Sequence, residues 1–146
     1  MQVEVKIDES CRELRVIVLT DAITEEVDAL LQRISKQPPQ LLAGFRADAV
    51  TLLQEDEILR VYASAGKVYA VTGRGAYVLR LRLYEAEERL GTRSFVRISG
   101  SEIINLKKVR GFDLSLAGTI RVSLSDGSTT YVSRRYVSKI KEKLGI

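Results

Sequence analysis

Histidine and tryptophan are absent from the 146 residues, and there is a single cysteine. The lack of histidine excludes a Ser–His or Cys–His nucleophile pair, an imidazole base at neutral pH and a His-ligated zinc. Carboxylates are plentiful, but they gather in clusters typical of solvated faces, at Glu55–Glu57 and Glu85–Glu88. We therefore predict no catalytic residue, no metal site and no cofactor, and we expect that the protein is not an enzyme.

Long hydrophobic runs are also missing. The longest, such as Val16–Leu19 and Leu41–Ala43, fall far below the roughly 20 residues that cross a bilayer. The N-terminus alternates charged with aliphatic residues and lacks the apolar core of a secretory signal. Cys11 has no partner for an internal disulfide, which agrees with a reducing compartment. We expect a cytoplasmic protein.

Charge of opposite sign is separated along the chain. Residues 1–90 carry a net charge of −3, whereas residues 91–146 carry +7. This asymmetry predicts an anionic partner for the C-terminal part, and nucleic acid is the commonest one because neutralised phosphates release their counterions. A basic surface that only keeps the protein soluble is the alternative.

The N-terminal segment has the pattern of two strands and a helix. Residues 2–7 alternate aliphatic with polar side chains and residues 14–20 are rich in β-branched ones, so a hairpin with a turn at Asp8–Ser10 is expected. After Thr24, a plausible N-cap, a helical period places four apolar residues on one face, Val27, Leu30, Leu31 and Ile34.

Gln37-Pro38-Pro39 should end this helix. We therefore expect a ββα extension over residues 1–44, which is too small to hold itself together easily and should pack on the rest of the chain.

Short strand-like runs separated by turn signals fill the middle of the chain, as in an antiparallel sheet. They are residues 41–46, 49–54, 58–64, 67–72 and 76–81, with turn signals at Gly44, Asp56, Ala65-Gly66 and Gly73–Gly75. Leu83–Leu90, followed by Gly91, predicts a short helix. Residues 95–98 are expected to be extended, and residues 101–106 to form one helical turn or a brief loop.

The C-terminal third of the chain has stronger turn and helix signals. Asp126-Gly127 predicts a hairpin turn between strands at 118–124 and 129–132. Ser133 resembles the N-cap of a terminal helix whose apolar stripe is Val137, Ile140 and Leu144. The expected fold class is mainly β (α+β), with small antiparallel sheets and short helices.

The start of the terminal helix is the first candidate binding site. Arg134 and Arg135 lie where the helix dipole favours anions, which invites a phosphate or a guanine edge. Pairing of one of them with a carboxylate is an equally weighted alternative.

Two further candidates precede it. In Phe95–Ser101, the polar Arg97, Ser99 and Ser101 surround Gly100, which suits phosphate contacts but equally suits a plain strand end. Lys107-Lys108 opens a basic run, and such a run is most often only a solvated face.

The order of these pieces resembles the LytTR family of DNA-binding domains. The resemblance rests on Phe-Val-Arg-Ile-Ser-Gly-Ser-Glu-Ile-Ile-Asn-Leu at 95–106, Ser-Asp-Gly at 125–127 and Tyr-Val-Ser-Arg-Arg-Tyr-Val at 131–137. It covers residues 45–146. It implies small antiparallel sheets that contact DNA through loops and a helix end, without a helix-turn-helix, and binding to direct repeats in promoters.

The resemblance also implies three places of base contact, which match Lys67, the Ser99–Ser101 stretch and Arg135. Two of these positions depart from the family pattern: Gly100 stands where several members carry a polar side chain, and Lys67 where a histidine or another polar residue occurs. The full set that we expect to contact DNA is Lys67, Arg97, Ser99, Gly100, Ser101, Lys107, Lys108, Ser133, Arg134, Arg135 and Lys139.

Residues 1–44 are too few for a receiver domain of the family's response regulators, so control by phosphorelay is not expected. The prediction is thus a transcription regulator that binds double-stranded DNA as a homodimer or as two copies on tandem sites. Stand-alone members of the family further suggest a small membrane protein as a partner. The alternative function is a protein-interaction module that docks on an acidic or membrane-associated partner. The sequence gives less support to RNA binding, because it lacks paired aromatic motifs.

Overall fold

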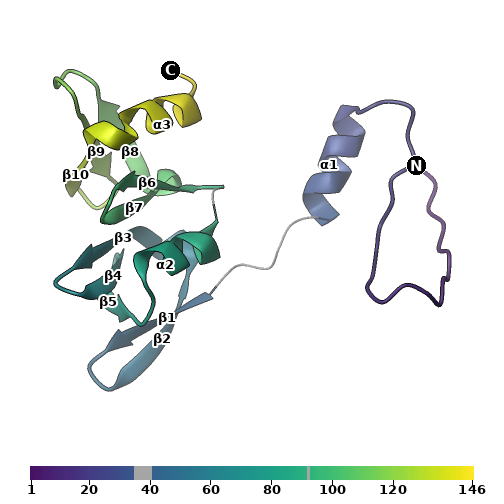
Figure 1. Ribbon diagram of the computed structural model, residues 1–146, viewed down its shortest axis with the longest axis horizontal. Helices are drawn as coiled ribbons and strands as arrows, with labels where there is room; N and C mark the ends of the chain where they lie inside the picture. The colour runs from purple at the N-terminus through teal and green to yellow at the C-terminus, as the bar shows by residue number, and fades with distance from the viewer. Residues whose placement is uncertain (35–40, 92) are drawn as a thin grey trace. The chain divides into compact units, whose positions relative to one another are not determined.

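The computed structural model describes residues 1–34, 41–91 and 93–146, and the chain divides into two units, Met1–Gln37 and Pro38–Ile146 (Figure 1). The first unit contains helix α1, Glu25–Ile34. Its N-cap is confirmed: the amide of Val27 donates to the Thr24 hydroxyl at 3.4 Å. The expected end of this helix at residues 37–39 lies outside the described residues. No described helix has the length and hydropathy of a membrane span.

The two strands expected at residues 2–7 and 14–20 are wrong. Residues 1–24 contain the expected turn, in which the amide of Cys11 donates to the carbonyl of Asp8 at 3.1 Å, but no strand. The composition favours strands, yet a strand requires a neighbour, and the described part of this unit supplies none.

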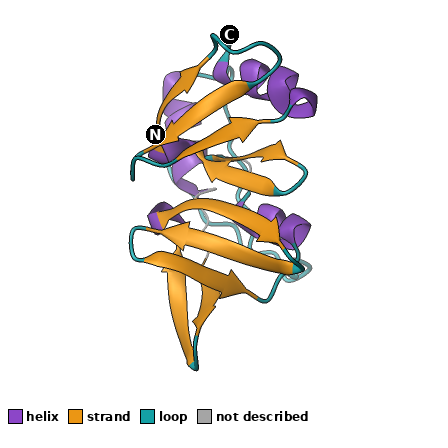
Figure 2. Ribbon diagram, turned by 90° about the vertical axis from the view of Figure 1, so that its left-hand side faces the viewer, coloured by secondary structure: helices purple, strands orange, loops and turns teal. Residues whose placement is uncertain are grey.

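The second unit is built from two antiparallel sheets (Figures 1 and 2). The first has seven strands in the order β2-β1-β5-β4-β3-β7-β6 and the second has three in the order β10-β9-β8. The strands of the first sheet are β1 (Leu41–Arg46), β2 (Ala49–Gln54), β3 (Ile58–Ser64), β4 (Lys67–Thr72), β5 (Gly75–Leu79), β6 (Phe95–Ser99) and β7 (Glu102–Asn105). Those of the second are β8 (Val109–Asp113), β9 (Ile120–Leu124) and β10 (Thr129–Val132). The expected mainly β fold class is confirmed.

Two further helices and two 3₁₀ turns complete this unit: α2 (Leu83–Leu90), α3 (Arg134–Leu144), η1 (Glu55–Glu57) and η2 (Leu106–Lys108). Gly91 and Gly145 end α2 and α3 as positive-φ residues, as expected of helix stops. The whole of β1 belongs to this second unit, including residues 41–44, which the sequence assigned to the extension.

Strands β3, β6 and β7 contribute to two separate hydrophobic cores. Ile103 lies in the first core with α2, whereas its neighbour Ile104 lies in the second core with β9, β10 and α3. Phe95 and Ile98 divide in the same way along β6. Since successive side chains of a strand point to opposite faces, one half of the large sheet lies between α2 on one side and the small sheet with α3 on the other.

This double burial explains why residues 101–106 were assigned wrongly. Residues Glu102–Asn105 form β7 instead of a helical turn or loop. Ile103, Ile104 and Asn105 are all at most 1% exposed, so the alternation that marks a half-exposed strand is missing.

The turn expected at Gly44 is also wrong, because this residue lies within β1. It pairs with Thr51 on one side and Leu79 on the other. A Cβ atom there would lie 2.8 Å from both Leu53 Cδ1 and Tyr77 Cβ. Glycine is therefore required by close packing, and the turn between β1 and β2 falls at Ala47, whose φ is 51°.

Candidate nucleic-acid interface

Two backbone hydrogen bonds bring together three segments that are far apart in the sequence. The amide of Ala63, near the end of β3, donates to the carbonyl of Ser101 at 2.8 Å. The amide of Ser133, at the start of α3, donates to the carbonyl of Ile98 at 2.8 Å. The β3–β4 turn, the β6–β7 turn and the first turn of α3 are therefore neighbours. We call the surface formed by residues 63–67, 97–101 and 133–139 the three-segment face.

A bulge in β6 makes the contact with α3 possible. The pairing of β6 with β7 shifts between Arg97 and Ser99, so Ile98 leaves the ladder and its carbonyl can accept from Ser133. The side chain of Ile98 is fully buried in the second core, where Ile140 of α3 is also buried. The helix start is therefore fixed by a hydrogen bond and by packing.

The β6–β7 turn holds its own shape through the two serines. The amide of Ser101 donates to the Ser99 hydroxyl at 3.2 Å, and the two hydroxyl oxygens lie 3.4 Å apart. Gly100 and Ser101 are exposed and Ser99 is half-buried. The turn therefore presents small hydroxyl groups and open backbone, which suit phosphate oxygens or base edges.

Arg97 links this turn to α2. Its Nε donates to Glu87 of α2 at 3.1 Å and its Nη1 donates to the carbonyl of Gly100 at 2.9 Å. Its side chain is only 19% exposed. Arg97 was expected to contact DNA, but the structure uses two of its donors to tie the turn to α2.

The start of α3 is basic and lacks a side-chain cap. Ser133 occupies the N-cap position, but its hydroxyl makes no capping hydrogen bond. Arg134 and Arg135 are both exposed, and within residues 41–91 and 93–146 neither forms an ion pair with a carboxylate. The alternative of a carboxylate-paired arginine is therefore contradicted in the described unit.

Each arginine is nevertheless held in place. The Arg134 guanidinium lies over Gly118, where an added Cβ would be 2.9 Å from its Nε. The guanidinium carbon of Arg135 lies 5.7 Å from the ring centre of Tyr136, and Nζ of Lys139 lies 6.0 Å from the same ring. Tyr136 packs against the second core, so it supports both cations.

The electrostatic character of the three-segment face follows from its sequence. Residues 63–67, 97–101 and 133–139 contain five Lys and Arg residues and no Asp or Glu. Carboxylates next to these segments are already paired, Glu102 with Arg60 at 3.0 Å and Glu87 with Arg97 at 3.1 Å. Lys67 is exposed and pairs across the β3–β4 turn with Ser64. The face therefore attracts anions.

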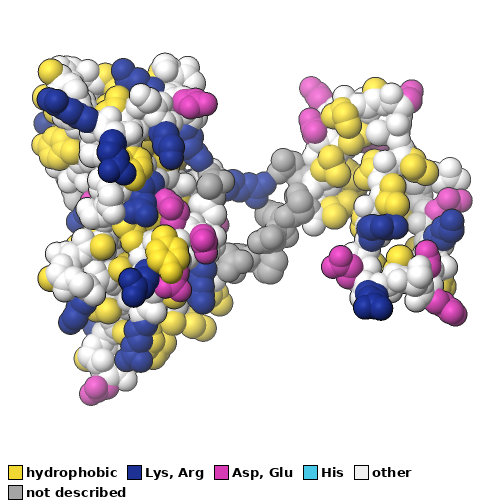
Figure 3. All heavy atoms as spheres, viewed as in Figure 1, with side chains coloured by type: hydrophobic (Ala, Val, Ile, Leu, Met, Phe, Trp, Pro, Cys, Tyr) yellow, Lys and Arg dark blue, Asp and Glu magenta, His cyan; other side chains and the backbone are white. Residues whose placement is uncertain are grey.

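The whole second unit shares this bias. Residues 38–146 contain 18 Lys and Arg against 11 Asp and Glu, a net charge of +7. In Figure 3, Lys and Arg side chains outnumber Asp and Glu on the visible face of this unit. Residues 1–37 contain 5 against 8, a net charge of −3.

Lys107 and Lys108 are not brought to the three-segment face. They lie in η2 at the far end of β7, near the start of β3, where the Asn105 side-chain amide donates to the carbonyl of Ile58 at 2.9 Å. The seven residues of β3 separate this end from the β3–β4 turn, which corresponds to roughly 20 Å of extended chain.

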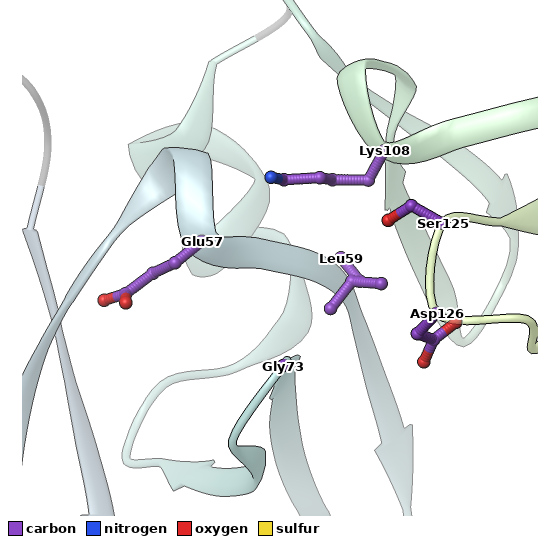
Figure 4. Close-up of a pocket in the computed structure, with 6 residues that line it drawn as sticks. All are labelled: Glu57, Leu59, Gly73, Lys108, Ser125 and Asp126. Atoms are coloured by element: carbon purple, nitrogen blue, oxygen red, sulfur yellow. The ribbon is translucent and has the colours of Figure 1, made fainter.

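Lys108 instead lines a shallow recess of about 360 Å³ (Figure 4). Its other lining residues are Glu57, Leu59, Gly73, Ser125 and Asp126. Figure 4 shows the Glu57 side chain directed away from Lys108, and its carboxylate is paired with Arg74 at 2.9 Å. Asp126 also lines the recess, so the recess holds a carboxylate beside its lysine, whereas the three-segment face holds none.

Sequence reasoning missed the supporting residues of the face. Glu87 and Gly118 shape it through Arg97 and Arg134, and their roles depend on contacts between distant segments. The contact of Tyr136 with Lys139 could have been found, because residues three positions apart on a helix are neighbours on its surface.

Comparison with known proteins agrees with this geometry. Residues 48–145 match the family model described as the LytTr DNA-binding domain. The chain belongs to the LytTR family. Two proteins named uncharacterized HTH-type transcriptional regulators, from Staphylococcus aureus strains NCTC 8325 / PS 47 and MRSA252, are 36% and 35% identical over 105 residues, which cover 72% of this chain and 71% of each relative.

A solved LytTr DNA-binding domain, from a methyl-accepting/DNA response regulator of Bacillus cereus, has the same fold. It superposes with a TM-score of 0.71 at 21% identity and covers 75% of this chain and all of that one. In the LytTR unit of the present chain, α2 and α3 are separated by five strands, so within residues 41–91 and 93–146 no helix-turn-helix is formed.

Proposed function

We propose that the protein is a transcription regulator that binds specific double-stranded DNA sequences through the three-segment face. The observation that carries this proposal is the hydrogen bond from Ser133 to Ile98, because it places the basic start of α3 beside the β6–β7 turn. The match of residues 48–145 to a DNA-binding domain family supports it.

Each segment has a role that follows from its chemistry. Arg135 has no carboxylate partner in the described unit and can donate two parallel hydrogen bonds to guanine O6 and N7. Ser99, Gly100 and Ser101 provide a second contact through hydroxyl groups and backbone. Lys67 provides a third, as a mobile positive charge for a phosphate or a guanine.

The remaining basic groups position the phosphate backbone. Arg134 and the amides at the uncapped start of α3 suit a phosphate oxygen. Lys139 is exposed and lies one helical turn after Arg135. Lys107 and Lys108, at the other end of β7, are left with at most a peripheral phosphate contact. Two copies on direct promoter repeats would place the same face in successive major grooves.

Selection of genomic fragments by the purified full-length protein at about 0.15 M salt tests the proposal, because screening at this salt weakens non-specific attraction. We expect enrichment of a short motif repeated about one helical turn apart. Recovery of random fragments, with binding that depends on salt alone, would overturn sequence-specific recognition and favour docking on an acidic partner.

A further inference from the structure

The first unit leaves unusually much apolar surface in water. The side chains of Val3, Val5 and Ile7 are 79–88% exposed, and Leu14 and Leu19 are more than 90% exposed. Exposure of so many aliphatic groups is unfavourable, and a unit of fewer than about 40 residues usually needs a partner or a cross-link to be stable. Within the described part of the first unit, these side chains have no surface to pack on.

The N-terminal segment has the sequence pattern of a strand. Residues 2–7 alternate aliphatic with polar side chains, and they precede a formed turn in which the amide of Ser10 donates to the Asp8 carboxylate at 2.9 Å. Within the described residues this segment has no ladder of its own. An exposed segment of this composition is suited to pair with another strand.

We propose that residues 2–8 pair with the same residues of a second copy of the chain, in an antiparallel arrangement centred on Val5. In this register Val3 faces the second copy's Ile7 and Val5 faces the second copy's Val5, so one side of the pair is wholly apolar. On the other side Glu4 faces the second copy's Lys6, and the symmetry repeats that contact. Opposite charges across a strand pair are stabilising.

Charge disfavours the registers centred on Glu4 and on Lys6. Centring the pair on Glu4 places two glutamates opposite each other, and centring it on Lys6 places two lysines opposite each other and Glu4 opposite Asp8. A shift of one residue places Val3 opposite Lys6, because it exchanges the two faces. A parallel, in-register pair aligns every charge with its own copy. Of the registers compared, the one centred on Val5 combines a wholly apolar side with two Glu4–Lys6 contacts, and it is formed by two copies of the same segment.

Cysteine cross-linking of the full-length protein tests this register. In a Cys11→Ser background, Val5→Cys places two thiols on directly opposed residues, whose Cα atoms are about 4.5–5.5 Å apart in an antiparallel pair. This separation suits a disulfide. We expect mild oxidation to convert most of this variant into a covalent dimer.

The matched control is Ile7→Cys in the same background. Position 7 opposes position 3 and not itself, so its own copies lie about 13 Å apart along the strands and should not cross-link. A mixture of Val3→Cys and Ile7→Cys chains should instead give the mixed dimer. Equal cross-linking of Val5→Cys and Ile7→Cys, or none by Val5→Cys, would overturn the register.

Sedimentation of the untagged protein tests the association itself. We expect twice the chain mass of 16.3 kDa, and we expect Val5→Asp to give the monomer. Val50→Asp, at a 58% exposed position of β2, should remain a dimer. A monomeric wild-type protein at every concentration would overturn the proposal and would indicate that the unit is covered by its own chain or by another protein.

These measurements are made without DNA, so their outcome is independent of the proposed function. We expect Val5→Asp to bind a single copy of the repeat as well as the wild type does and to lose the gain in affinity that two adjacent copies provide. A Val5→Asp protein that keeps the whole of this gain would show that the strand pair plays no part in binding tandem sites.

Discussion

The amide of Ser133 lies 2.8 Å from the carbonyl oxygen of Ile98. This hydrogen bond joins the last helix to a strand end 35 residues earlier in the chain, and its acceptor lies at the bulge in β6, the edge strand of the large sheet. The position of the two arginines after Ser133 thus depends on an irregularity in β6. Substitutions at this face and at its supports should therefore change DNA binding in different ways.

Replacement of Arg135 by alanine should reduce affinity for the selected DNA site by about 1–3 kcal/mol and relax sequence preference at one base pair. The physical reason is the loss of two hydrogen bonds to a base edge. Lys108→Ala removes the same charge from the far end of β7 and should weaken binding to all DNA sequences slightly and equally. Binding titrations on the site and on single-base variants measure both, and unchanged discrimination by Arg135→Ala would refute the assignment.

Arg97→Lys should weaken DNA binding by about 1 kcal/mol although it keeps the charge. A lysine ammonium lacks the planar fork that reaches Glu87 and the Gly100 carbonyl at once. The turn at Gly100 then loses its support, and the affinity for the site should fall while the salt dependence stays the same.

The matched control is Arg74→Lys, whose surface ion pair with Glu57 lies beyond the end of β4, at the other end of that strand from Lys67 and the β3–β4 turn. It should leave affinity unchanged. If the two variants behave alike, Arg97 does not position the turn.

Gly44→Ala should reduce the free energy of unfolding by about 1–3 kcal/mol, because its Cβ has no room between Leu53 and Tyr77. Gly111→Ala is the control, since its Cβ would meet nothing within 4 Å. Denaturant titration of both proteins measures the difference. A similar midpoint for the two variants would show that β1 and its neighbours move apart easily.

The carboxyl group of Asp126 should titrate below its ordinary range. The Ser128 hydroxyl and then the Ser128 amide donate to it, which lowers its pKa from the usual 3.8. Because the pKa is lowered in the folded state, this interaction stabilises the β9–β10 hairpin above pH 3.8 and is lost as the pH falls through the folded value. NMR titration should show a higher pKa for Asp126 in Ser128→Ala, and an unchanged value would contradict the assigned cause.

The sequence predicted β1 to β4 and α2 with their observed bounds, because each is a run of strand-forming or helix-forming residues that changes at a polar or glycine-containing segment. It failed where burial is two-sided: in β7, Ile103 and Ile104 serve different cores, and no periodicity in a sequence distinguishes that from a buried helical turn. The missed β8 contains a bulge between Val109 and Gly111, which breaks its alternation.

The residues of the candidate site were also predicted only in part. The basic start of α3 and the Ser99–Ser101 turn were found from residue type and order, and the structure places them side by side. Lys107 and Lys108 were included because they open a basic run, whereas β7 carries them to the other end of the strand from the β6–β7 turn. Arg97 was chosen for its charge, but its hydrogen bonds depend on α2, which no local pattern indicates.

Gly100 lies at the tip of the β6–β7 turn, and a Cβ built there would meet nothing within 4 Å. Its φ is outside the left-handed region that requires glycine. The position can therefore accept almost any side chain without disturbing the two cores beneath it. Under the proposed function, a substitution at Gly100 is expected to change the preferred DNA sequence without loss of stability, because the residue that would contact DNA makes no contribution to either core.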